Sequence, residues 1–160
     1  MTWYDVVGIL LVVVVAWLES KRGFGRAIFD LLGAIIALKL ALFLAAPMGE
    51  SVPLMGSAEA NQAFWLAAVF GVLAVLIVVA SKFVYETTLL SLDVLDPVVG
   101  GLLGLASGMA VAHIFLKTLL VSYGDAEVAK VLVGSFVGQE LLEFRTYHYV
   151  FNALQNLGHW

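Results

Sequence analysis

The sequence predicts an all-α, polytopic membrane protein with four transmembrane helices and a C-terminal amphipathic helical tail. Three observations support this fold class: 62% of the 160 residues are apolar, only 12% are charged, and the mean hydropathy is +1.03. A chain this short cannot hide so many apolar side chains in one core, because small domains leave much of their surface in water. We therefore expect most of these side chains to face lipid.

Four continuous apolar runs predict a transmembrane domain over residues 1–123. Each approaches the roughly 20 residues that an α-helix needs to cross the hydrocarbon of a bilayer, and none alternates with the period of two typical of a transmembrane strand. The first run is the shortest, so Trp3 and Tyr4 are expected to anchor it at the membrane interface. The predicted spans are residues 3–18, 27–46, 63–80 and 98–123.

Proline and glycine mark the connections between these spans. Residues 47–62 contain two prolines and two glycines, which favour turns, so a loop of moderate length is expected there. Asp96 followed by Pro97 places a capping carboxylate before a first-turn proline. The fourth helix is therefore expected to begin at Pro97.

The distribution of positive charge predicts the orientation in the membrane. Lys21, Arg22 and Arg26 lie between the first two spans, whereas residues 47–62 contain no Lys or Arg. Short cytoplasmic connections are enriched in these residues. The first connection is therefore expected to face the cytoplasm, and both termini are expected to lie outside.

Residues 124–160 form the predicted tail. From Glu140 onward, apolar residues recur at helical spacing, with polar residues on the opposite face. Such a segment fits a helix lying in the membrane interface or, equally, a helix docked on the bundle.

Ionisable side chains within a span need a partner or a route to the surface, because each costs roughly 2.5 to 3.5 kcal/mol at mid-helix on insertion scales. Asp30 lies one turn after Arg26, so a local ion pair or snorkelling accounts for it. If the first two helices form an antiparallel hairpin turning near Gly23, Lys39 and Asp5 lie at comparable depth. A Lys39–Asp5 ion pair is one hypothesis, and snorkelling of Lys39 is the other.

His113 and Lys117 lie one turn apart in the fourth span. A proton relay is one interpretation, and a packed or interfacial position is the more common one. The three histidines lack metal-ligand spacing, no nucleophile motif accompanies them, and cysteine is absent. We expect no catalytic, cofactor or metal site, and hence no enzyme. A net charge of -4 without a Lys/Arg cluster beyond three residues also argues against nucleic acid as a partner.

The fourth span carries a glycine ladder, defined as Gly100, Gly104 and Gly108. Small residues on one stripe allow two helix backbones to approach closely in a membrane. The partner helix could belong to the same chain or to a neighbouring copy. In the second case, a homo-oligomeric channel or transporter could be built around this helix.

The chain resembles the colicin V production protein (CvpA) family of small bacterial inner-membrane proteins over most of the four-helix region. The residues that carry the resemblance are Trp3-Tyr4-Asp5, the connection Lys21-Arg22-Gly23-Phe24-Gly25-Arg26, and Leu95-Asp96 followed by the glycine ladder. The family commonly has Glu where this chain has Ala27, and often Arg where it has Pro97 and Ser107. Any role that needs those charges is therefore in doubt.

The resemblance implies an integral inner-membrane protein linked to production or export of the peptide toxin colicin V and, more broadly, to envelope homeostasis. The implied partners are the lipid bilayer and export or envelope proteins. Under this interpretation Lys21, Arg22, Gly23, Phe24 and Arg26 form a cytoplasmic contact element, although their positive charge could equally serve only to set topology.

Overall fold

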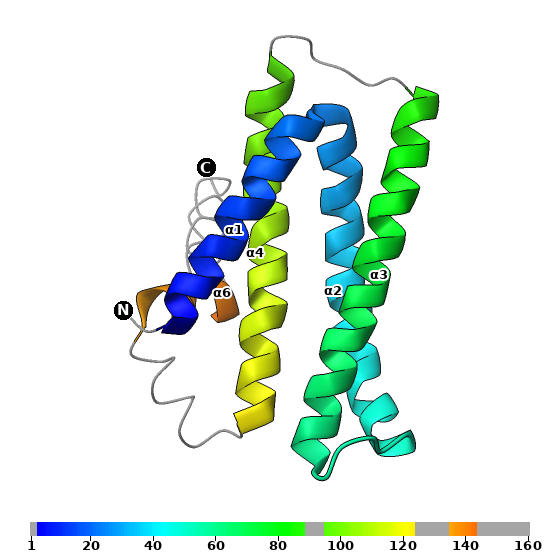
Figure 1. The fold of residues 1–160 in the computed structure, drawn as a ribbon, viewed down its shortest axis with the longest axis vertical. Helices are drawn as coiled ribbons and strands as arrows, with labels where there is room; N and C mark the ends of the chain where they lie inside the picture. The colour runs from blue at the N-terminus through cyan, green and yellow to red at the C-terminus, as the bar shows by residue number, and fades with distance from the viewer. Residues whose placement is uncertain (1–2, 89–94, 124–134, 144–160) are drawn as a thin grey trace, which may run out of the picture.

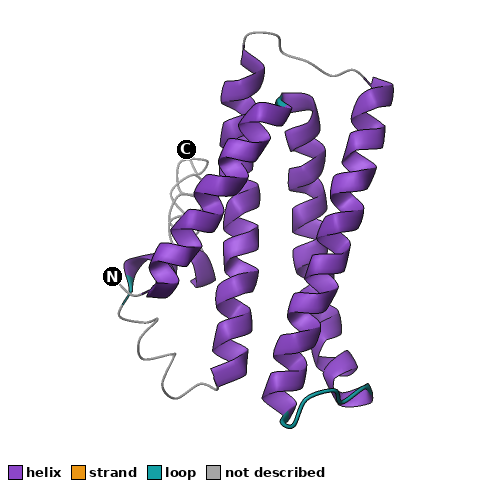
Figure 2. Cartoon of the chain, in the orientation of Figure 1, coloured by secondary structure: helices purple, strands orange, loops and turns teal. Residues whose placement is uncertain are grey.

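The computed structural model describes residues 3–88, 95–123 and 135–143, and almost all of them are helical, as Figure 1 and Figure 2 show. Four helices are long and apolar enough to cross a membrane, and the described residues include no strand. The predicted all-α class with four helices of membrane-spanning length is therefore confirmed. The helices are α1 (Trp3–Arg22), α2 (Phe24–Ser51), α3 (Ala58–Thr88), α4 (Asp96–Tyr123) and the short α6 (Phe136–Glu143).

The second and third helices are longer than the apolar runs that predicted them. α2 continues through Pro47 to Ser51, and α3 begins at Ala58. The prediction of a loop over all of residues 47–62 is therefore wrong, because the connection is confined to residues 52–57. Pro47 removes one backbone hydrogen bond but does not end the helix, since the Val52 N–H still closes the last turn on the Met48 carbonyl at 2.9 Å.

The long helices form two pairs, which Figure 1 shows side by side. α1 packs chiefly against α4, α2 packs chiefly against α3, and a contact between α2 and α4 joins the pairs. α1 and α2 separate from the turn at Gly23 and contact each other little. They do not form the close antiparallel hairpin on which the Lys39–Asp5 hypothesis depended.

A stripe of small residues on α2 makes the interface with α3 and α4. Its members are buried and recur at every fourth position, and larger side chains from the neighbouring helices, among them Leu66, Phe70 and Ile114, fill the space beside it. Van der Waals contact across such stripes holds helices together where lipid removes the hydrophobic driving force. The stripe consists of Gly33, Ala37, Ala41, Ala45 and Gly49.

Large apolar side chains point outward from the bundle. On α3, Val72, Val75, Val79 and Phe83 recur at helical spacing and are all exposed. Small residues inside and bulky apolar residues outside are the arrangement expected of helices surrounded by hydrocarbon.

The short helix α6 docks on α1 and α4. The Leu141 side chain is buried beside Ala112 and Leu116 of α4. Ser135 caps the helix, because its Oγ accepts a hydrogen bond from the Gly138 N–H at 3.0 Å. The part of the predicted tail over residues 144–160 lies outside the described residues.

Candidate functional site

A cluster of charged side chains lies inside the bundle near the turn between α1 and α2. The charged cluster comprises Glu19, Arg22, Arg26 and Asp30, together with the hydroxyl of Ser81 from α3. Helical spacing places Glu19 and Arg22 on one face of α1, and Arg26 and Asp30 on one face of α2. The turn then brings the two faces together.

Arg22 and Asp30 are the centre of the charged cluster. Nη1 of Arg22 donates to Glu19 Oε1 at 2.6 Å and to Asp30 Oδ2 at 3.1 Å. Ser81 Oγ donates to the other oxygen of Asp30, and Arg26 Nε lies 3.9 Å from Asp30 Oδ2. These contacts connect α1, α2 and α3 through a single carboxylate. The local pair expected between Arg26 and Asp30 is therefore present, but Arg22 makes the closer contact with Asp30.

The two carboxylates of the charged cluster are deeply buried. Glu19 is 3% exposed and Asp30 is 6% exposed, whereas the Arg22 side chain keeps 28% of its surface. Oε2 of Glu19 and Nε of Arg26 have no hydrogen-bond partner among the described residues. A buried polar atom without a partner costs free energy, so Glu19 Oε2 is the acceptor, and Arg26 Nε the donor, that the described part of this cluster leaves unsatisfied.

A cavity of about 210 Å³ adjoins the charged cluster and extends toward the middle of the bundle. All four long helices contribute to its wall. Its polar lining comes from Glu19, Arg22, Asp30 and Ser107, and its apolar lining includes Phe70 and Val111. The charged groups therefore border an internal space and not lipid alone.

The turn depends on glycine at position 23. Gly23 has φ 83°, a conformation that side-chain-bearing residues rarely adopt. A β-carbon there would also lie 3.1 Å from Asp96 Oδ2. Glycine thus allows the chain to reverse with Glu19 and Asp30 on facing sides.

The structure places the residues of the predicted cytoplasmic contact element in different environments. Lys21 is exposed, and its Nζ lies 3.7 Å from the centroid of the Trp17 ring. Phe24 is half-buried. Arg22 and Arg26 point into the charged cluster, so their guanidinium groups are engaged within the chain. Lys21 is therefore the exposed side chain among these residues, and partner contact through this element stays a prediction.

The glycine ladder of α4 packs against α1 of the same chain. A β-carbon added at Gly100, Gly104 or Gly108 would lie 2.7 Å from a backbone atom of α1. No side chain fits at that distance, so the two backbones are in contact. Because α1 covers this stripe, the ladder no longer supports a channel assembled through it. The same contact fixes the backbone of Glu19, whose carbonyl faces Gly100.

The Lys39–Asp5 ion pair is absent from the described part of the chain. Asp5 is buried and accepts a hydrogen bond from Ser135 Oγ, whereas Lys39 lies on an exposed face of α2. The hypothesis was wrong because α1 leans toward α4 and α6, away from the length of α2 that carries Lys39.

His113 connects α4 to α6. Its Nδ1–H donates to the Leu141 carbonyl at 2.7 Å, and a carbonyl only accepts, so this ring nitrogen carries a proton. The ring is 8% exposed. Lys117, one turn further along, is half-buried. This contact gives His113 a role in docking α6, and the proton relay stays a prediction. No group of three metal-binding side chains occurs within residues 3–88, 95–123 and 135–143.

Sequence reasoning missed three members of this site. Glu19 follows the predicted first span directly and was passed over, although its spacing of three from Arg22 is a signal for an ion pair. Ser81 and Ser107 carried no local signal, because their partners and the cavity belong to other helices.

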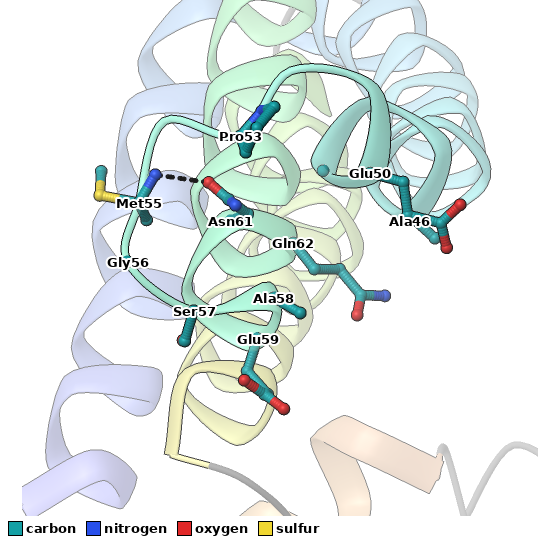
Figure 3. Close-up of a pocket in the computed structure, with 11 residues that line it drawn as sticks. Ala46, Glu50, Pro53, Met55, Gly56, Ser57, Ala58, Glu59, Asn61 and Gln62 are labelled. Atoms are coloured by element: carbon teal, nitrogen blue, oxygen red, sulfur yellow. Dashed lines mark hydrogen bonds between the residues drawn. The ribbon is translucent and has the colours of Figure 1, made fainter.

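A second hollow, of about 450 Å³, lies at the opposite end of the bundle (Figure 3). Asn61 organises it, because its Oδ1 accepts hydrogen bonds from the Leu54 and Met55 N–H groups at 2.7 and 2.6 Å. Glu50 and Glu59 border this hollow. The two ends of the bundle therefore differ in charge: the carboxylates at this end have no basic residue in the surrounding residues 47–62.

Comparison with known proteins identifies one family. A family model described as "Colicin V production protein" matches residues 4–143. Neither a curated protein nor a solved structure matches the chain. The resemblance inferred from the sequence is therefore confirmed.

Proposed function

Because the chain belongs to the colicin V production protein family, we propose that it is a non-enzymatic inner-membrane protein that supports production or export of colicin V, or envelope homeostasis, through contacts with other proteins. The observation that carries this proposal is that the family match runs from the first turn of α1 to the end of α6. The bundle and its docked helix thus correspond to the family as one unit.

We propose that the end of the bundle with the charged cluster faces the cytoplasm. Lys21, Arg22 and Arg26 lie at the turn between α1 and α2, and Lys82 lies near the end of α3, which reaches the same side in Figure 1. Loop residues 52–57 and the neighbouring carboxylates lie at the other end. This asymmetry follows the positive-inside rule and places the N-terminal end of α1 outside. By alternation of the spans, the C-terminus is also proposed to lie outside.

Single-cysteine labelling tests the orientation cleanly, because the native chain contains no cysteine. Gly56→Cys and Lys21→Cys place one thiol at each end, and a β-carbon at position 56 meets nothing within 4 Å. In spheroplasts, a membrane-impermeant maleimide should label the Gly56→Cys variant at once and the Lys21→Cys variant only after permeabilisation. The reverse pattern would contradict the proposed orientation.

Complementation tests the function. In a colicin V-producing strain that lacks its own family member, the wild-type chain should restore secreted toxin or resistance to envelope stress. Lys21→Gln should reduce this activity several-fold at unchanged membrane abundance, because Lys21 is exposed at the proposed contact element. Lys82→Gln is the matched control, since that lysine is exposed and pairs with Glu86 of its own helix at 3.9 Å. A wild-type chain that restores neither phenotype would refute the proposal.

A further inference from the structure

Glu19 and Asp30 bring two carboxyl groups together inside the membrane-spanning bundle. Both accept a hydrogen bond from the same nitrogen, Nη1 of Arg22, at 2.6 and 3.1 Å, so the two buried carboxyl groups are neighbours. We propose that Glu19 and Asp30 form a binding site for one exchangeable proton, shared between their facing oxygens at the end of the inter-helix cavity.

The distribution of hydrogen bonds indicates which acid holds the proton. Asp30 is satisfied as an anion: one oxygen accepts from Ser81, and the other lies near both Arg22 and Arg26. Glu19 uses only Oε1, and its buried Oε2 has no donor among the described residues. A proton on Oε2 removes this deficit and donates to Asp30, whereas two facing carboxylates would repel each other. The proton therefore resides on Glu19.

The charges around the pair come from α1 and α2. α1 contributes Arg22, and α2 contributes Arg26, whose Nη2 also donates to the Val78 carbonyl at 3.3 Å. Within the described part of α3, the pair meets the neutral hydroxyl of Ser81.

The other nearby charges lie at the margins of the site. α4 places Asp96 against Gly23 at the turn, and Lys82 and Glu86 of α3 form an exposed pair. Ser107 of α4 donates to its own helix, at the Leu103 carbonyl.

The cavity provides a path for exchange. Glu19 and Asp30 both line it, and a volume of about 210 Å³ next to polar groups accommodates several water molecules. Arg22, the residue that joins the two acids, is 28% exposed at the end of the bundle. The proton can thus move between Glu19 and water without passing through hydrocarbon.

Infrared spectroscopy of the full chain in lipid nanodiscs tests this inference. The wild type should show the C=O stretching band of a protonated carboxylic acid at neutral pH, shifted in D₂O and lost as the pH is raised. Glu19→Gln should abolish the band. Asp30→Asn should also abolish it, because a single carboxylate beside Arg22 is stabilised in its ionised form. Glu50→Gln, at the opposite end, is the matched control and should keep the band.

Two results would overturn the proposal: absence of the band from the wild type, or its persistence at full intensity in Glu19→Gln. The D₂O and pH measurements on the wild type require no variant, so a variant that fails to fold leaves the test intact. Circular dichroism establishes the helix content of each variant. The measurement does not involve toxin production, and its failure leaves the proposed function standing.

Discussion

The two helix pairs of the bundle use small residues in different ways. Between α1 and α4, glycine faces backbone: Gly104 would place a β-carbon 2.7 Å from Ala16 Cα. Between α2 and α3, Gly33 faces the side chain of Ile77. The atoms nearest to Gly104 belong to the backbone or are a β-carbon, so they cannot rotate away, whereas those nearest to Gly33 belong to a side chain that can rotate. Similar spacing in sequence therefore produces two interfaces with different tolerance of added volume.

The pairs meet at the charged cluster, where Arg22 joins α1 to α2 and indirectly to α3. Arg22→Gln should have the largest effect, because it leaves two buried carboxyl groups without their shared donor. We expect a loss of about 3 kcal/mol in the free energy of unfolding, measured by SDS titration in mixed micelles. Lys82→Gln should change this value by less than about 0.5 kcal/mol, since its ion pair is exposed. Equal effects would show that the buried cluster does not join the two pairs.

The backbone contact between α1 and α4 predicts the next largest effect. Gly104→Ala should lower the free energy of unfolding by about 2 kcal/mol, because α1 must move away to admit the methyl group. Gly71→Ala is the matched control, since a β-carbon there meets nothing within 4 Å. If both variants unfold alike, the close approach of α1 and α4 is incorrect.

The side-chain contact between α2 and α3 predicts a smaller loss. Gly33→Ala should cost about 1 kcal/mol in the same assay, because the Ile77 side chain can adopt another rotamer. In an Ile77→Ala background the same substitution at Gly33 should cost less, because alanine lacks the Cγ1 and Cγ2 atoms that the added methyl group would meet. A cost at Gly33 equal to or greater than that at Gly104 would remove the distinction between the two interfaces.

Several features of the fold could be predicted because their signals are local. The glycine ladder predicted close packing of the fourth helix, since its residues recur along one face whatever the partner is. The spacing between Arg26 and Asp30 likewise predicted a local pair. The equally regular stripe from Gly33 to Gly49 was overlooked, although the sequence contains it. Its alanines are less conspicuous than glycines in an apolar run.

Other features could not be predicted, because they depend on the direction in which helices leave a turn. A close hairpin was assumed at Gly23, and that assumption produced the Lys39–Asp5 pair. In the structure, α1 packs along α4, and Asp5 accepts a hydrogen bond from Ser135. Ser81 joined the charged cluster through a contact with Asp30, a residue 51 positions earlier in the chain.

The sequence by itself determined that this is an all-helical membrane protein. Its apolar runs and the placement of Lys and Arg decide which segments enter the lipid and which stay in water. Only the tertiary structure decided which helix covers the glycine ladder and which oxygen of Glu19 lacks a donor. Transfer into lipid is a sum over residues along the chain, whereas packing and hydrogen bonding depend on where distant residues lie relative to each other in space.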